Sequence, residues 1–342
     1  MTDNDPTAAA RKQDHIELAF QSQIGGGELD NRFHYEPLLA GHPAEGSLPE
    51  TDFGGKTMRA PLWVSSMTGG TERARGINHR LAQVCAEFGL GMGLGSCRSL
   101  LYSTDRLADF DVRPIIGDTV PLFANLGVAQ VEELIDRSDL DRIPALIDLL
   151  RADGLIIHVN PLQEWLQPEG DRFQRPPLVV IKTVLAAYPD LPLVVKEVGQ
   201  GFGPASLHAL LQLPLLAVEF AANGGTNFSK LELFRADEQL RDAYGPVTYL
   251  GHSAEQMVKT VNSILTQLGD KAKVKQLIVS GGVKNFLDGY FYTELLHLPA
   301  VYGQASAFLR YAQEEDYAAL QRYVNLQVRG LEMAHAFLRV RR

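Results

Sequence analysis

The sequence predicts a (β/α)₈ barrel, an α/β fold in which eight parallel strands close into a ring inside a layer of helices. Eight short runs of apolar, largely β-branched residues recur between residues 62 and 305. Helical stretches separate these runs, as expected for parallel strands that are buried on both faces. Each run ends in a small, polar or charged residue, and a length of 342 residues suits one barrel with extensions.

The expected strands follow one another in order after residue 60. They lie within residues 62–70, 88–96, 120–127, 153–160, 191–199, 215–225, 275–282 and 300–305. The alternative is a doubly wound open sheet, which would carry G-x-G-x-x-G directly after its first strand. The glycines of GMGLGS (91–96) lack that spacing and belong to the second run, so we interpret them as a strand that approaches a ligand closely.

The residues before the first strand form no comparable pattern. Residues 1–10 are expected to be a disordered tail, and 11–60, rich in glycine and proline, an N-terminal extension that folds over the barrel mouth. Residues 61–342 then make up the cofactor-binding barrel.

Composition narrows the class of partner. A net charge of −9 argues against a nucleic-acid or anionic-membrane partner, which would favour a basic face. Two cysteines are too few for a disulfide framework and indicate reduced thiols. The first residues lack the apolar stretch of a signal peptide, and no run approaches the ~20 apolar residues of a membrane span. We therefore expect a cytoplasmic enzyme with a small-molecule substrate.

Polar side chains at the carboxyl ends of the strands are the first candidates for function, because these ends face the active site of a barrel. They are Thr68, Ser96, Asn125, His158, Asn160, Lys196, Thr226 and the Gly281–Gly282 pair. Any one of them could simply cap a helix or end a strand. A complete ring of such residues instead indicates a ligand site.

The turns after the last two strands predict a phosphate site. SGGV (280–283) and GQAS (303–306) would present backbone N–H groups where barrels commonly bind phosphate. Lys196 ends an otherwise apolar strand, where its charge would be costly without an anionic partner such as reduced flavin. The alternative for Lys196 is an ion pair with Glu197 or Glu219. Together these features favour FMN as the cofactor.

Two further clusters suggest a diphosphate site. HVNPLQE (158–164) is more polar than a connection requires, and Glu164 could bind Mg²⁺ together with substrate phosphate oxygens. The alternatives are a solvated carboxylate and, for His158, a structural histidine. Arg11, Lys12 and Arg98 could clamp a diphosphate if the extension covers the mouth.

These segments resemble the type 2, FMN-dependent isopentenyl-diphosphate isomerases. The similar segments are RKQDH (11–15), SSMTGG (65–70), GLGMGLGSCR (89–98), ANLG (124–127), HVNPLQE with PEGDRF (158–173), VVKEVGQG (194–201), NGGTNFSKLE (223–232) and SGGVKN (280–285). The family interconverts isopentenyl and dimethylallyl diphosphates by a 1,3-proton shift, with reduced FMN, Mg²⁺ and NADPH or another reductant.

The resemblance also implies roles for individual residues. FMN would be held by Ser66, Met67, Thr68, Ser96, Asn125, Lys196, Thr226, Gly281, Gly282, Gly303 and Gln304. Substrate would be held by Arg11, Lys12, Ser96, Arg98, His158, Asn160 and Gln163. Gln163 would lie beside the reacting carbons as the catalytic residue, and Glu164 would be the Mg²⁺ ligand. A homo-oligomer, a tetramer or octamer, is implied as well.

Some positions depart from the family pattern. Lys284 stands where arginine is usual, Phe228 replaces a common tryptophan, and residues 249–257 and 289–306 are unusual. Two other functions stay open from the sequence, an FMN-dependent oxidoreductase of the hydroxyacid-oxidase type and a non-catalytic flavin-binding module. The HVNPLQE loop fits the oxidase poorly, because that reaction needs a base and a pair of arginines for its carboxylate.

Overall fold

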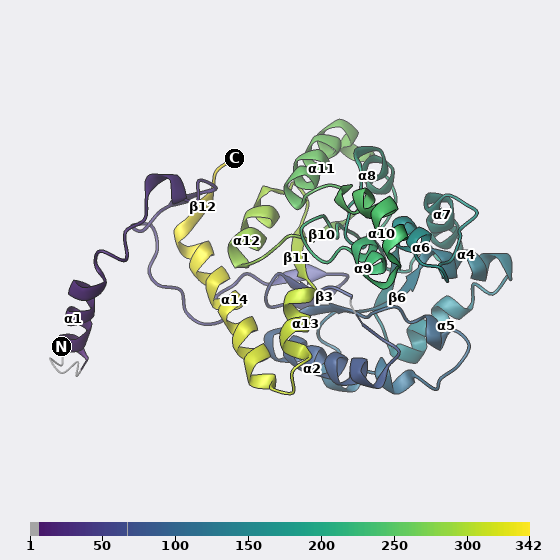
Figure 1. Ribbon diagram of the computed structural model, residues 1–342, viewed down its shortest axis with the longest axis horizontal. Coiled ribbons are helices and arrows are strands. Elements are labelled where there is room, and N and C mark those ends of the chain that lie inside the picture. Colours follow the sequence, from purple (N-terminus) through teal and green to yellow (C-terminus); the bar gives the residue numbers. More distant parts are fainter. Residues whose placement is uncertain (1–6, 67) are drawn as a thin grey trace.

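The computed structural model describes residues 7–66 and 68–342, and it confirms the (β/α)₈ barrel. Eight parallel strands close in the order β10-β11-β4-β5-β6-β7-β8-β9, inside a layer of helices (Figure 1). The strands are β4 (Leu62–Val64), β5 (Gly91–Gly93), β6 (Leu122–Gly127), β7 (Gly154–His158), β8 (Leu193–Lys196), β9 (Ala217–Glu219), β10 (Gln276–Ser280) and β11 (Ala300–Gln304). Each lies within one of the expected runs. The doubly wound alternative is excluded, because β4 pairs with both β5 and β11.

Successive side chains along each strand point alternately into the barrel and toward the helices, so the apolar side chains form two clusters. Ile156 of β7 belongs to an inner cluster with Trp63 and Phe123, whereas its neighbours along the strand face the helices. A hairpin of β2 (Thr51–Phe53) and β3 (Lys56–Met58) adds Phe53 to the same inner cluster, with its ring centroid 5.0 Å from that of Trp63. The barrel is therefore a packed core, and its polar chemistry is confined to the strand ends.

Helices lie between the strands along the chain, and some of them begin at residues whose side chains cap them. Thr71 Oγ1 accepts a hydrogen bond from Ala74 N at 3.2 Å, and Ser253 forms a capping box with Gln256. The helices of the barrel are α2 (Glu72–Phe88), α3 (Arg113–Ile116), α4 (Val128–Asp136), α5 (Arg142–Leu150), α6 (Pro161–Leu166), α7 (Pro177–Ala187), α8 (Pro204–Leu211), α9 (Phe228–Arg235), α10 (Glu238–Tyr244), α11 (Ala254–Leu268), α12 (Phe286–Leu295), α13 (Ser306–Ala312) and α14 (Tyr317–Phe337). Short 3₁₀ turns lie at 26–28, 98–100, 107–109, 245–249 and 269–271.

The N-terminal extension begins with a helix that lies apart from the barrel. Helix α1 (Ala8–Leu18) buries none of its residues and projects away from the barrel in Figure 1. The helix is mostly alanine and charge, so it lacks the continuous apolar stripe that would dock it on the barrel. The extension is anchored later, where β1 (Phe33–Tyr35) pairs antiparallel with β12 (Leu338–Val340).

Both cysteines are buried and free, as expected for reduced thiols. Cys85 lies on α2 and Cys97 follows β5. Burial raises the pKa of Cys85, and it raises that of Cys97 to about 12. Within the described ranges, none of the helices has the length and apolar character needed to cross a membrane.

Candidate active site

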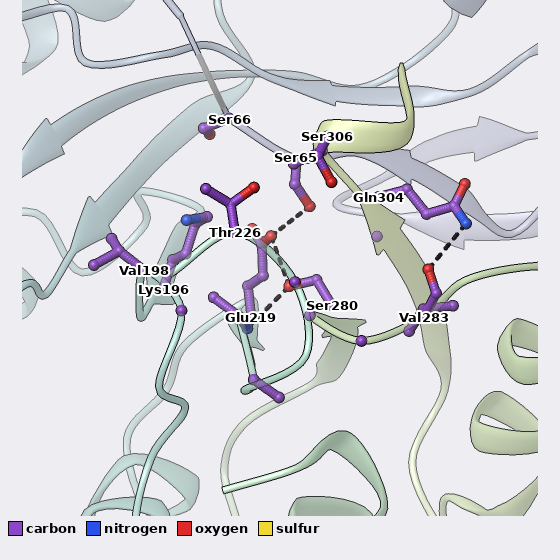
Figure 2. Close-up of a pocket in the computed structure, with 18 of the residues that line it drawn as sticks. Ser65, Ser66, Lys196, Val198, Glu219, Thr226, Ser280, Val283, Gln304 and Ser306 are labelled. Atoms are coloured by element: carbon purple, nitrogen blue, oxygen red, sulfur yellow. Dashed lines mark hydrogen bonds between the residues drawn. The ribbon is translucent and has the colours of Figure 1, made fainter. Parts of the chain in front are cut away.

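A polar pocket opens at the carboxyl ends of strands β8 to β11 and β4 (Figure 2). Its lining includes many of the residues predicted to hold the cofactor. Those that line it are Ser66, Lys196, Thr226, Gly281, Gly282, Gly303 and Gln304. The strand-end rule therefore placed these residues together, although they are scattered over much of the sequence.

The glycine turns bring bare backbone to the pocket wall. Gly281 and Gly282 have φ values of +82° and +76°, in the left-handed region that favours glycine. A Cβ on Gly281 would lie 2.0 Å from Ala222 O, and one on Gly303 would lie 2.5 Å from Ser65 Oγ. Any side chain at either position would clash, so the main chain there remains accessible to a ligand such as phosphate.

The side chain of Gln304 does not point into the pocket. Its Nε2 donates to Val283 O at 3.1 Å, as Figure 2 shows, and its Oε1 accepts from Tyr323 Oη at 2.7 Å. Only the backbone of Gln304 is therefore available to a cofactor, whereas the side chain fixes the turn.

Lys196 brings a buried positive charge to the pocket. The residue is 5% exposed, and its Nζ donates to the backbone oxygen of Glu197 at 2.9 Å. The Glu197 carboxylate is turned away, because its Oε2 accepts from the backbone N–H groups of residues 199–201. Among residues 7–66 and 68–342, no carboxylate forms an ion pair with Lys196, so the pairing with Glu197 or Glu219 is not made. A buried ammonium of this kind favours an anionic ligand.

Glu219 places a buried carboxylate at the floor of the same pocket. The residue is 0% exposed, and its Oε1 accepts from Ser65 Oγ at 2.6 Å and from Ser280 Oγ at 3.0 Å (Figure 2). Over the described part of the chain, Glu219 Oε2 and Ser66 Oγ are buried without a hydrogen-bond partner. Unmet hydrogen-bonding capacity in a pocket indicates a polar ligand.

A second cluster forms around α6. Asn160 directly precedes this helix, and its Nδ2 donates to Gln163 Oε1 at 3.1 Å and to Glu164 Oε1 at 2.9 Å. Glu164 is 9% exposed, and its Oε2 accepts from Asp171 N at 2.7 Å. The start of α6 thus brings together the amides of Asn160 and Gln163 and the carboxylate of Glu164.

Glu232 of α9 completes this cluster, although sequence reasoning gave it no role. Its Oε1 accepts from Gln163 Nε2 at 3.1 Å and from Gln167 Nε2 at 2.6 Å. Because an ionised carboxylate only accepts, Gln163 must direct its amino group at Glu232 and its oxygen at Asn160. The only sequence signal for Glu232 was its place at the end of NGGTNFSKLE.

His158 and Asn125 are joined beside Lys196. His158 Nδ1 and Asn125 Oδ1 are 2.9 Å apart, and Asn125 Nδ2 donates to Leu94 O at 3.0 Å. Burial, aided by the charge of Lys196, lowers the pKa of His158 to about 3. The ring is therefore neutral near pH 7 and can donate from Nδ1 and accept at Nε2. Asn125 does not itself line the pocket at the strand ends.

Other predicted residues lie outside the pocket. Ser96 and Arg98 are exposed, and Arg98 pairs with Asp171 at 3.1 Å, next to Glu164. Thr68 is partly buried, with its backbone close to Gly95. Met67 lies outside the described residues.

The extension and the family departures can also be placed. Arg11 and Lys12 lie on α1, away from the mouth, because that helix does not fold over the barrel. Lys284 is exposed and does not line the pocket, whereas Phe228 does. The departure at Lys284 therefore leaves the pocket lining unchanged.

A metal ion would need ligands from a bound substrate. The described residues contain no group of three or more His, Cys, Asp or Glu side chains that could hold an ion. Glu164 nevertheless offers a buried carboxylate, and the neighbouring Asn160 Oδ1 is buried without a partner. One carboxylate and one amide oxygen fit Mg²⁺, which takes its remaining ligands from water and phosphate.

Comparison with known proteins identifies the family. The chain is 35% identical over 316 residues to an isopentenyl-diphosphate delta-isomerase of Rickettsia peacockii (strain Rustic), covering 90% of this chain and 86% of the relative. It is 33% identical over 333 residues to that of Rickettsia felis, covering 94% and 90%. The chain belongs to the isopentenyl-diphosphate delta-isomerase family. The resemblance stated from the motifs is thereby confirmed.

Solved structures support the fold independently. A flavocytochrome b2 variant with sulfite bound superposes with a TM-score of 0.61 at 16% identity, over 89% of this chain and 72% of the other. A mandelate oxidase variant with an FMN adduct gives 0.53 at 14% identity, over 99% of both chains. No family model matches the sequence. At these identities the likeness establishes the barrel fold alone.

The low pKa of His158 predicts a pH-dependent stability. The unfolded imidazole gains a proton near its ordinary pKa of 6.5, and the folded one only near 3. The folded state therefore binds fewer protons between these values, and this contribution to stability, present above pH ~6.5, is lost as the pH falls toward 3.

In His158→Gln, the drop in melting temperature from about pH 7 to about pH 4.5 should be smaller than in wild type by at least roughly 2 °C. His208→Gln, at an exposed position on α8, is the control. Equal pH profiles for His158→Gln and wild type would contradict the buried neutral ring.

Proposed function

We propose that this protein interconverts isopentenyl and dimethylallyl diphosphates, using reduced FMN and Mg²⁺. The observation that carries the proposal is the relationship to isopentenyl-diphosphate delta-isomerases over 90% of the chain. The reaction adds a proton to the terminal alkene carbon and removes another from the methylene next to the diphosphate-bearing carbon. Atoms and electrons balance within the substrate, so the reductant serves only to keep the cofactor reduced.

The polar pocket fits FMN in three respects. The turns at Gly281–Gly282 and Gly303–Gln304 present backbone to a phosphate. Lys196 can compensate the negative charge of the reduced ring, and Ser66 and Thr226 add hydrogen-bonding groups to the pocket lining. Residues at the neighbouring strand ends, Met67, Thr68, Ser96 and Asn125, would complete the site. When bound, reduced FMN would supply the acid/base group that a proton shift requires.

The α6 cluster would hold the diphosphate beside this pocket. Glu164 would hold Mg²⁺, which would supply positive charge to offset the negative charge of the diphosphate. Arg98, now paired with Asp171, lies close enough to Glu164 to contribute a positive charge. Ser96, Asn160 and neutral His158 would add hydrogen bonds. Arg11 and Lys12 would join the site only after α1 moves from the position described above.

Gln163 would act on the carbon skeleton rather than on the phosphates. Its amide is held on both sides, by Asn160 and by Glu232, so its orientation is fixed before substrate arrives. A neutral amide cannot protonate an alkene unaided. Gln163 would instead orient the reacting carbons or relay a proton between them and the cofactor, using its remaining N–H and lone pair.

The remaining features of the proposal concern the whole enzyme. We infer a cytoplasmic homo-oligomer, a tetramer or octamer, with NADPH as its reductant. The support is the family relationship together with reduced thiols and the acidic, non-membrane composition.

A turnover assay tests the function directly. Protein loaded with FMN and reduced chemically should convert isopentenyl diphosphate to dimethylallyl diphosphate in the presence of Mg²⁺, with no net consumption of reductant. The product is measured by chromatography and the flavin by its absorbance. Consumption of one reductant or one hydroxyacid per turnover would instead identify an oxidoreductase. Binding of FMN without any turnover would identify a flavin-binding module.

Glu164→Gln should weaken the metal site while leaving FMN in place. The glutamine oxygen can still accept from Asp171 N, but the negative charge that attracts Mg²⁺ is lost. The Mg²⁺ concentration for half-maximal activity should rise at least about 10-fold, since even the loss of outer-shell partners costs that much. Glu332→Gln is the matched control, because it neutralises a buried carboxylate of α14 far from the pocket. An unchanged Mg²⁺ requirement in Glu164→Gln would make Glu164 a structural residue.

Gln163→Ala should lower kcat far more than it raises KM or the FMN dissociation constant. A group that acts mainly in the transition state affects kcat and kcat/KM together, and a drop of ~10²–10⁴-fold is expected. Gln167→Ala is the control, because Gln167 donates to the same oxygen of Glu232. If Gln163→Ala folds normally and retains most of the wild-type kcat, Gln163 has no part in the chemistry.

A further inference from the structure

Glu219 is a buried carboxylate that is only half used. Serines from two distant strands donate to its Oε1, Ser65 after β4 and Ser280 at the end of β10. In the described part of the chain, its Oε2 meets no donor, and the side chain is fully buried. A buried acceptor without a donor costs free energy, which a ligand bearing a donor would recover.

Two serine hydroxyls donate to Glu219. Ser280 Oγ accepts from Ala221 N at 2.9 Å and donates its own hydrogen to Glu219 Oε1 at 3.0 Å. Ser65 Oγ donates to the same oxygen of Glu219 at 2.6 Å. Both serines act as donors toward one oxygen, as expected for an ionised carboxylate. The second oxygen then requires a donor and not an acceptor.

The position of Glu219 indicates which part of a ligand it meets. Glu219 lies on β9, between Lys196 on β8 and the Ser280–Gly281 end of β10, and all three line the pocket. Lys196 favours the electron-rich ring of the cofactor, whereas the turn at Gly281 is open to its phosphate. In FMN, the group that links ring to phosphate is a polyol chain, which carries hydroxyl donors.

From this juxtaposition we propose that Glu219 binds a hydroxyl group of the polyol chain of FMN through its free oxygen Oε2. Glu219 is thus a cofactor-binding residue that fixes the chain between the ring and the phosphate. The inference rests on the proposed FMN cofactor and adds a residue that selects for the polyol. It also explains why a charged residue occupies the end of an otherwise apolar strand.

Flavin binding tests the proposal without reference to turnover. Cofactor-free full-length protein is titrated with FMN and with an analogue whose polyol hydroxyls are replaced by hydrogen, leaving ring and phosphate intact. Dissociation constants are measured from flavin fluorescence. Wild type should prefer FMN over the analogue by about 10-fold or more, since hydrogen bonds to charged groups are worth roughly that much. In Glu219→Gln, affinity for FMN should fall about 10- to 100-fold while affinity for the analogue stays close to that of wild type.

Matched variants separate binding from folding. Glu332→Gln removes another fully buried carboxylate and should preserve the preference for FMN. Glu219→Asp retains the charge but shortens the side chain, so it should show a smaller loss confined to FMN, and it serves if Glu219→Gln does not fold.

Three results would overturn the proposal. Equal FMN affinity in wild type and Glu219→Gln would assign Glu219 to the fold alone. An equal loss for FMN and the analogue would place the contact on the ring or phosphate. Failure of wild type to bind either flavin would reject the FMN cofactor itself, and with it this contact.

Discussion

The pairing of β11 with β4 is the interaction on which the site depends. It joins the last strand of the barrel to the first, with Gly303 opposite Trp63 and Gln304 opposite Val64. Directly beyond the pairing, Ser65 N donates to Gln304 O at 3.0 Å. Residues more than two hundred positions apart are thereby fixed at hydrogen-bonding distance. Without this closure, neither Ser65 nor the glycine turn at Gly303 would be held in place at the pocket.

The closed barrel concentrates incompletely paired polar groups in one place. Lys196 and Glu219 are opposite in charge and are partners in strand register, yet each is bonded to uncharged groups rather than to the other. Such an arrangement sacrifices stability, because a direct buried pair or an apolar pair would leave less hydrogen-bonding capacity unused. Departures of this kind from the rules of good packing are typical of functional sites.

Local sequence patterns were sufficient for the strands but not for the contacts between them. Each strand is an apolar run that ends in a polar or glycine residue, so its position and the direction of its last side chain could be predicted. Glu219 was visible as a charge in an apolar run, but its partners Ser65 and Ser280 come from remote segments. The same is true of Glu232, which orients Gln163 from a helix 69 positions away. The position of α1 has no comparable signal in the sequence, since a polar helix without an apolar stripe does not indicate what it packs against.

The two buried thiols can report local opening of the barrel, because each becomes accessible only when its surroundings separate. Cys85 lies on the buried face of α2 and Cys97 follows β5, both inside the main apolar core, and burial keeps them protonated. Alkylating and oxidising reagents react with accessible thiolate, so neither residue reacts in the closed state. Modification must wait until the helix layer separates from the strands. The rate of thiol labelling therefore measures how often the helices on this side of the barrel separate from the strands while the rest of the protein stays folded.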